Sequence, residues 1–380
     1  MSLKTLRAVF MRGGTSKGLM VHAADLPPLR DDWAPIFLAA MGSPDPNGRQ
    51  LDGMGGGLSS LSKVCVIGPP TRPDADVDYT FAQVAVGDAA VDYAGNCGNM
   101  SSAVGPFAVS EKLVDAPLDG EARVRIHNVN TGKVIVSRFA VRDGQALLDG
   151  DCEIDGVAGA GAPIRLDFVE PGGAKTGKLL PTGRPVDDLV LADGSTVRAS
   201  LVDASNPCVF VAAEDVGCTG TEMPGQLERD KALLDRLEAI RQAASLAMGF
   251  TTDFDAAARL LSIPKVAMLS GPAPWRSLSG REFDAADCDI AVRMISVGQP
   301  HRAVPITGGL CVAAACRIPG TIASMLLRAR GDSIRIGHPS GRLEVDAQAQ
   351  ERDGGMHIAV ATVYRTARPL FRGEVLYRAG

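Results

Sequence analysis

The sequence predicts an α+β fold made of two similar halves, each a β-roll wrapped around one central helix. Short runs rich in β-branched residues, separated by Gly, Pro and Asp, fill most of the chain, and their style repeats after about residue 185. Two segments of helical length, 99–112 and 307–316, begin with small or polar residues and then become wholly apolar. Because a helix that is apolar on all sides must be buried, each is expected at the centre of a surrounding sheet.

The expected strands form two sets, one in each half. The first set is 6–11, 18–23, 63–68, 78–86, 122–130 and 133–141, and the second is 197–204, 208–213, 265–271, 289–298, 333–338 and 357–365. Two more helices are expected at 31–41 and at 226–248, where the apolar residues are strongly periodic. The sequence therefore predicts an N-terminal domain over 1–185 and a C-terminal domain over 186–365.

Composition excludes several classes of partner. The 380 residues are 46% hydrophobic and 22% charged, which is typical of a globular protein large enough for two domains. Aromatic residues make up 4%, the net charge is −5, and no basic block occurs, so nucleic acid is not an expected partner. No apolar run reaches the roughly 18 residues of a membrane helix, and the start lacks the apolar core of a signal peptide. The predicted location is the cytoplasm, with no membrane partner.

Cysteine and histidine spacing argues against a metal site. The eight cysteines contain no C-x-x-C pair, and none of the five histidines lies three or four residues from another histidine or from a cysteine. We expect the cysteines to be mostly reduced and buried. The sequence predicts no metal and no cofactor.

One cysteine stands at a chemically useful place. In "VDYAGNCGNMSSAVGPFAV" (91–109), Cys97 directly precedes the apolar central helix, whose first turn holds Asn99, Met100 and Ser101. A helix N-terminus presents unpaired N–H groups and a partial positive charge, which favour carboxylates and promote ionisation of a thiol. The alternative is an inert, buried cysteine.

A lysine follows a glycine-rich segment. "QLDGMGGGLSSLSKVCVIG" (50–68) contains three consecutive glycines, ending at Gly57, that allow the backbone to approach a ligand, and it leads to Lys63 before an apolar strand. The spacing does not match a phosphate-binding P-loop. If the Lys63 side chain faces a cleft that excludes water, it can give and accept protons. The alternative is that the Lys63 side chain points into solvent and has no chemical role.

Two further segments carry candidate ligand contacts. "MRGGTSKG" (11–18) offers Arg12, which can pair with a carboxylate, together with Thr15 and Ser16. The alternative is a tight hairpin that needs the same glycines.

"SVGQPHRAVPITGG" (296–309) leads from His301 into the second central helix at Thr307 and Gly308. The alternatives are a structural histidine and a threonine that only caps the helix. Taken together, these segments favour proton transfer on a small polycarboxylate.

These blocks, in this order, resemble the family that includes 2-methylaconitate cis-trans isomerase, 4-oxalomesaconate tautomerase and 3-methylitaconate Δ-isomerase. The resemblance rests on "MRGGTSKG", "GSPDPNGRQLDGMGG", "SK" at 62–63, "NCGNMSSAVGPFA" and "HRAVPITG", and it runs from about residue 7 to the end. The tail "YRTARPLFRGEV" is most similar to the tautomerase branch. One departure is Leu61, where members of the family often have threonine.

The resemblance implies a fold similar to that of diaminopimelate epimerase, with the active site in the cleft between two β-roll domains. It also implies that the chain end, residues 366–380, returns to the first domain. The family's catalytic lysine and cysteine match Lys63 and Cys97. The implied reaction is a cofactor-independent 1,3-allylic proton shift in an unsaturated di- or tricarboxylic acid, with either residue as the base.

The substrate contacts that the motif match and the helix-start geometry predict are Arg12, Thr15, Ser16, Gly57, Asn99, Met100, Ser101, His301, Thr307 and Gly308. The exact acid is left open, and a homodimer is the default assembly. One alternative is an epimerase or racemase of the same fold; against it, Thr307 stands where a second thiol is needed, and Cys311 lies about one turn further on. The other is a non-catalytic carboxylate-binding accessory protein.

Overall fold

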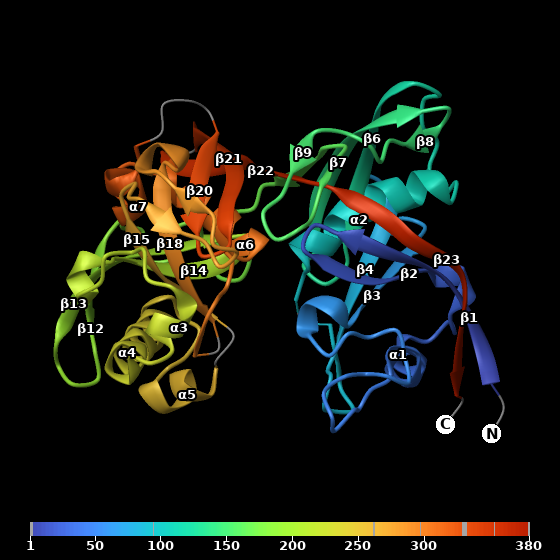
Figure 1. Cartoon of the computed structure of the whole chain (residues 1–380). Helices are drawn as coiled ribbons and strands as arrows, with labels where there is room; N and C mark the ends of the chain where they lie inside the picture. The colour runs from blue at the N-terminus through green and yellow to red at the C-terminus, as the bar shows by residue number, and fades with distance from the viewer. Residues whose placement is uncertain are drawn as a thin grey trace. The chain divides into compact units, whose positions relative to one another are not determined.

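Figure 1 shows the computed structural model, which describes residues 3–93, 95–260, 263–296, 298–328, 333–352 and 354–378. The contacts divide the chain into two compact units. Unit 1 comprises Met1–Asp167 and Tyr364–Gly380, and unit 2 comprises Phe168–Val363. Among the residues described, no helix combines the length and the apolar character needed to span a membrane.

The division after residue 167 lies earlier than the predicted division after residue 185. The intervening segment packs with unit 2 through specific hydrogen bonds. Thr176 N donates to the Asp203 carboxylate at 2.7 Å, and Ser200 Oγ donates to Pro185 O at 2.6 Å. The turn residues of segment 168–185 carry no sequence pattern that indicates which of the two units they contact. The position of the domain boundary therefore could not be read from the sequence.

The main strands of unit 1 form one mixed sheet around a buried helix. They are β1 (Leu3–Gly13), β2 (Ser16–His22), β3 (Lys63–Gly68), β4 (Val77–Val84), β6 (Gly120–Asn128), β7 (Lys133–Arg142) and β23 (Ala367–Arg378). Shorter strands are β5 (Val91–Asp92), β8 (Gln145–Ala146), β9 (Cys152–Glu153) and β10 (Ala160–Gly161); β11 (Ile164–Val169) and β22 (Gly355–Arg365) cross between the units.

The last strand of the chain pairs with the first. β23 runs antiparallel to β1 over its whole length, with Leu3 opposite Arg378 and Gly13 opposite Ala367 (Figure 1). On its other side β1 forms a hairpin with β2, and β2 pairs in parallel with β3. The tail is therefore an integral strand of unit 1.

Two helices pack on the sheet of unit 1. α2 (Gly98–Ser110) is buried along nearly its whole length and contacts β1, β2, β6 and β7, as the apolar sequence predicts. α1 (Trp33–Met41) contacts β4, β5 and β23, and its Phe37 and Met41 belong to the same buried apolar cluster as Leu19 and Val64. Single turns of 3-10 helix occur at Ala23–Asp25, Arg30–Asp32 and Ser59–Leu61.

Unit 2 repeats this plan. Its strands are β12 (Asp187–Val190), β13 (Thr196–Ala204), β14 (Asn206–Ala212), β15 (Lys265–Ser270), β16 (Trp275–Arg276), β17 (Glu282–Phe283), β18 (Ile290–Ser296), β19 (Gln299–Pro300), β20 (Ile334–His338) and β21 (Gly341–Arg352), with β22. Its helices are α3 (Pro224–Leu227), α4 (Lys231–Ala247), α5 (Phe254–Arg259), α6 (Ile306–Cys316) and α7 (Ile322–Leu326), with 3-10 turns at Glu214–Val216 and Ala285–Asp287.

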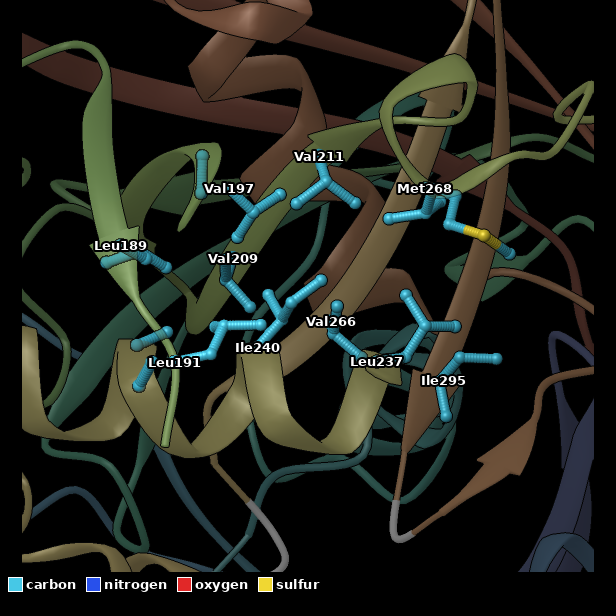
Figure 2. Close-up of a cluster of buried hydrophobic side chains, with 14 of the residues drawn as sticks. Leu189, Leu191, Val197, Val209, Val211, Leu237, Ile240, Val266, Met268 and Ile295 are labelled. Atoms are coloured by element: carbon cyan, nitrogen blue, oxygen red, sulfur yellow. The ribbon is translucent and has the colours of Figure 1, made fainter. Parts of the chain in front are cut away.

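The core of unit 2 lies between its sheet and α4 (Figure 2). Leu237 and Ile240 of α4 pack against Val209, Val266 and Ile295 of three neighbouring strands. The single helix predicted over 226–248 is divided into α3 and α4, because the Asp230 side chain accepts a hydrogen bond from the backbone N–H of residue 233 at 3.0 Å and starts a new helix.

The two units share a supersecondary arrangement. In each, a hairpin is followed by a strand that pairs in parallel with the second arm: β3 follows β1–β2, and β15 follows β13–β14. Each of these strands begins with a lysine, Lys63 or Lys265, and each unit buries one apolar helix, α2 or α6. The prediction of an α+β fold with two similar halves is confirmed.

Candidate active site

The N-terminus of α2 carries Cys97 as its N-cap residue. The first bond of the helix runs from Ser101 N to Cys97 O at 3.0 Å, so the N–H groups of Gly98, Asn99 and Met100 precede the intrahelical ladder. The Cys97 thiol is partly exposed, whereas Met100 and Ser101 are buried. This helix start therefore combines an accessible thiol with backbone donors that favour negative charge.

Lys63 is held at the start of β3 by a glutamine on the neighbouring strand. Its side chain is only 7% exposed, and Nζ donates to Gln83 Oε1 at 2.5 Å and lies 5.0 Å from the centre of the Phe81 ring. Gln83 in turn donates Nε2 to Ser59 O and Ser62 O, at 3.0 and 2.9 Å. These bonds fix the amide so that its oxygen faces the amine, and the lysine is confined to one position.

A buried thiol and a buried phenol, Cys65 and Tyr79, interact with the charges of the predicted catalytic residues. The Cys65 thiol donates to Tyr79 Oη at 3.7 Å, and both side chains are fully buried. Burial, followed by the charge of Cys97, raises the pKa of the Cys65 thiol, and the charge of Lys63 opposes that rise. Cys97 and Lys63 thus both lie within electrostatic range of Cys65, which brings the two predicted catalytic residues to one region of unit 1.

The hairpin between β1 and β2 lies directly on the first turn of α2. Thr15 N donates to Asn99 Oδ1 at 3.3 Å, and Asn99 Nδ2 donates to Thr15 Oγ1 at 3.0 Å. A Cβ on Gly13 would lie 2.7 Å from Asn99 O, and one on Gly14 would clash with Asn99 Oδ1. Both glycines of "MRGGTS" are therefore required by this close approach, and Gly14, whose φ is +51°, is also required by the turn.

Arg12 and Ser16 occupy the arms of the same hairpin. Arg12 Nη1 donates to Gly14 O at 3.1 Å and to Thr366 O at 2.9 Å. Burial, and to a lesser degree the charge of Arg368, lowers the pKa of Arg12. Ser16 is buried at the first position of β2. Arg12 thus joins the hairpin to the returning tail.

Gly57 belongs to a loop that is stabilised by Gln50. The Gly57 N–H donates to Gln50 Oε1 at 3.0 Å, and Gln50 Nε2 donates to Ser62 Oγ at 2.7 Å. The φ angle of Gly57 is +71°, which favours glycine. Its backbone donor is therefore engaged within the loop that leads to Lys63.

The remaining predicted contacts, His301, Thr307 and Gly308, belong to unit 2. Helix α6 begins at Ile306 with Pro305 as N-cap, so Thr307 lies inside the first turn and does not cap the helix. His301 is partly buried, and its Nε2 atom is fully buried and has no hydrogen-bond partner among the described residues. Burial, followed by the charge of Lys265, lowers the pKa of His301 to about 4.

Several residues of these environments carry no recognisable signal in the sequence. Gln83, Tyr79 and Lys265 belong to no motif, and Arg365 stands in the tail segment that was used only for its resemblance. The register of β3 against β4, which pairs Lys63 with Gln83, is the signal that identifies Gln83. No group of three or more His, Cys, Asp or Glu side chains that could hold a metal ion occurs in the described ranges, and all eight cysteines are free thiols.

Sequence comparison connects this chain with named isomerases. Residues 3–378 match the family described as PrpF protein. The chain is 43% identical to 3-methylitaconate isomerase of Eubacterium barkeri over 97% of this chain and 96% of that protein. It is 41% identical to 2-methyl-aconitate isomerase of Cupriavidus necator, over 97% and 96%, and 40% identical to 4-oxalomesaconate tautomerase of Pseudomonas putida, over 97% and 94%.

Comparison with solved structures also finds an isomerase and, at lower identity, a protein that shares only the fold. The crystal structure of a methylitaconate-delta-isomerase superposes with a TM-score of 0.88 at 41% identity and covers 99% of this chain and 96% of that chain. A probable proline racemase from Agrobacterium radiobacter reaches a TM-score of 0.53 at 14% identity, covering 99% and 93%, and shows a shared fold only. The predicted family and the predicted isomerase class are confirmed: the chain belongs to the PrpF protein family.

Proposed function

We propose that this protein is a cofactor-independent isomerase that moves a C=C bond within an unsaturated di- or tricarboxylate by a 1,3-allylic proton shift. The proposal is supported by a confined lysine, Lys63, at the start of β3 and a partly exposed thiol, Cys97, at the start of α2, which both lie within electrostatic range of Cys65. The relatives named above, which act on methylitaconate, methylaconitate and oxalomesaconate, support the substrate class.

The reaction requires a base, an acid and stabilisation of one anion. Lys63 removes a proton from the carbon γ to a carboxylate, and the C–H electron pair enters a dienolate that extends to the carboxylate oxygens. Cys97 then protonates the α carbon, which leaves the double bond between the β and γ carbons. The acid itself gains and loses no atom or electron, and proton exchange with solvent returns Lys63 and Cys97 to their starting states. The free N–H groups of the first turn of α2 stabilise the charge of the dienolate.

The hairpin residues are proposed to shape the binding site. The mutual hydrogen bonds of Thr15 and Asn99 hold the hairpin on the helix start, and Arg12 joins it to Thr366. The other proposed substrate contacts are Ser16, Gly57, Met100, Ser101, His301, Thr307 and Gly308. The cytoplasmic location and the homodimer stay predictions.

A two-thiol racemase is disfavoured by the start of α6. The N-cap residue there is Pro305, which offers no side-chain acid or base. Cys311 is fully buried in the second turn and donates to Val202 O at 3.4 Å. Burial also raises the pKa of its thiol, so it is unsuited to proton transfer.

The proposal is tested with proton NMR in D₂O on a panel of 4-oxalomesaconate, 2-methylaconitate, methylitaconate and trans-aconitate. We expect one of these acids to isomerise, with deuterium appearing at an allylic carbon. Cys97→Ser and Lys63→Met should each abolish isomerisation. Cys218→Ser and Lys112→Met, which change a partly exposed thiol and an exposed amine elsewhere, should retain it. Folded protein that exchanges no proton of any of the acids would contradict the proposal.

A further inference from the structure

A buried arginine that has no carboxylate partner among the described residues lies beside the helix start. Arg365, in unit 1, is only 9% exposed. Its Nη1 donates to Tyr364 O at 2.8 Å, but its Nε is buried and has no hydrogen-bond partner among the described residues. Within the same ranges no carboxylate forms an ion pair with it. Burial lowers the pKa of Arg365 to about 10, so the group is still charged at neutral pH.

The stem of this arginine reaches the point where the hairpin meets α2. A Cβ atom added to Gly14, which would clash with Asn99 Oδ1, would also lie 3.2 Å from Arg365 Cδ. Arg365 Cδ and the Asn99 side chain therefore lie on the same side of Gly14. The guanidinium group therefore begins beside the first turn of α2, where Asn99 follows Cys97 by two residues. Two independent sources of positive potential, the helix N-terminus and the guanidinium group, meet at this place.

A buried charge of this kind ordinarily has a partner. Desolvating a guanidinium group is costly unless hydrogen bonds and an opposite charge compensate it. A planar guanidinium group that has a free Nε–H matches a carboxylate, which accepts two parallel N–H bonds. Arg12, in contrast, already donates to two backbone carbonyls. Both of these bonds come from Arg12 Nη1, and of the two arginines Arg365 is the one that has a buried donor, Nε, without a hydrogen-bond partner among the described residues.

We propose that Arg365 binds one carboxylate group of the substrate and holds it over the first turn of α2 beside Cys97. This inference rests on the proposed function and adds a residue from the returning tail to the binding site. The bound carboxylate neutralises the guanidinium group, and the arginine fixes the substrate relative to the thiol. The ligand class is a di- or tricarboxylate.

The test compares Arg365→Met and Arg365→Lys with Arg368→Met, which removes an exposed arginine three residues further along. Calorimetry measures the Kd for tricarballylate, a saturated tricarboxylate that cannot isomerise, and initial rates give KM for the acid that the wild type converts. Because a hydrogen bond to a charged group contributes about 1.5–3 kcal/mol, Arg365→Met should raise both constants by roughly 10- to 150-fold. Arg365→Lys should raise them less, and Arg368→Met should leave them within about twofold.

Glutarate and methylsuccinate, which lack the central or a terminal carboxylate of tricarballylate, provide a readout that a purely structural role would not move. One of them should bind the wild type more weakly than tricarballylate does, and Arg365→Met should lose that difference. If Arg365→Met does not fold, Arg365→Lys is measured in the same way. Unchanged Kd and KM in a folded variant overturn the inference and leave the proposed function standing. A wild type that isomerises no acid contradicts the function, and the tricarballylate titration still tests Arg365.

Discussion

Lys63 depends on Gln83 for its position, since the glutamine oxygen accepts from Nζ while the glutamine nitrogen donates to three backbone carbonyls. The amide fixes the amine without touching the substrate in our account, so Gln83 is a positioning residue. Replacing it should disturb the direction of proton transfer more than binding.

Gln83→Leu should therefore lower kcat about 10- to 100-fold, because displacement of a catalytic group by about 1 Å has effects of this size. KM should change by less than about threefold. The pH profile of kcat should also shift, because the leucine no longer accepts a hydrogen bond from the amine. Gln145→Leu, at an exposed position of β8, is the control. An unchanged kcat and pH profile would show that Gln83 does not position Lys63.

His301 makes the stability of the protein depend on pH. Burial and the charge of Lys265 lower its pKa to about 4, whereas an unfolded histidine titrates near 6.5. Between these values the unfolded chain binds a proton that the folded chain does not bind. The free energy of unfolding should therefore be fully present above pH 6.5 and should fall as the pH drops toward 4.

The expected loss from this histidine is about 3 kcal/mol, at 1.36 kcal/mol for each pKa unit. Urea unfolding at pH 7.5, 6, 5 and 4.5 measures it, with His301→Gln as the comparison. The variant should lose less stability than the wild type on acidification. Parallel curves for the two proteins would mean that His301 is protonated equally in the folded and unfolded states.

At the level of elements, the central helices were the most predictable part of the fold. The expected 99–112 and 307–316 correspond to α2 and α6 with ends shifted by no more than two residues, because an unbroken apolar surface has few structural solutions. The helix predicted over 226–248 was wrong at its start, since Asp230 starts a new helix there. Contacts such as Lys63 with Gln83 depend on strand register, which no single motif encodes.

Helix α2 is also fitted tightly to its sheet at Gly105. In an open helix Gly→Ala is stabilising by about 1 kcal/mol. Here a Cβ would lie 2.7 Å from Phe139 Cε1 and 2.7 Å from Ser137 Oγ. We expect Gly105→Ala to lower the free energy of unfolding by about 1–3 kcal/mol, as overpacking of a core does.

Equilibrium urea unfolding measures this effect. Gly87→Ala is the matched control, because nothing lies within 4 Å of a Cβ at that position, and it should change stability by less than about 1 kcal/mol. A Gly105→Ala variant that is more stable than the wild type would show that α2 and β7 are less tightly packed than the structure indicates.

At the level of the whole molecule, the repeated strand patterns in the sequence predict two units. They do not predict that the boundary between the units lies after residue 167. Unit 2 is one continuous segment with its own core, so residues 168–363 should fold alone. Residues 1–167 alone should not form a stable domain, because β1 would lose its partner β23. We therefore expect residues 168–363 to fold on their own and residues 1–167 not to fold on their own.

A rearranged unit 1 provides the control. Because Leu3 lies opposite Arg378, a chain that runs from 364 to 378, through a short glycine linker, and then from 3 to 167 restores the β1–β23 pair. Circular dichroism during heating should show cooperative unfolding for 168–363 and for the rearranged unit 1, but not for 1–167. Cooperative unfolding of 1–167 at the same temperature as the rearranged form would contradict the role given to the tail.

The central claim is that Lys63 removes the γ proton of the substrate and Cys97 delivers a proton to its α carbon. Its most direct test follows each substrate proton by NMR in D₂O with the two variants separately. If Lys63 is the base and Cys97 the acid, Cys97→Ser should still exchange the γ proton of the substrate for deuterium while forming no isomer. Lys63→Met should do neither. Isomerisation at the wild-type rate by either variant would contradict the account.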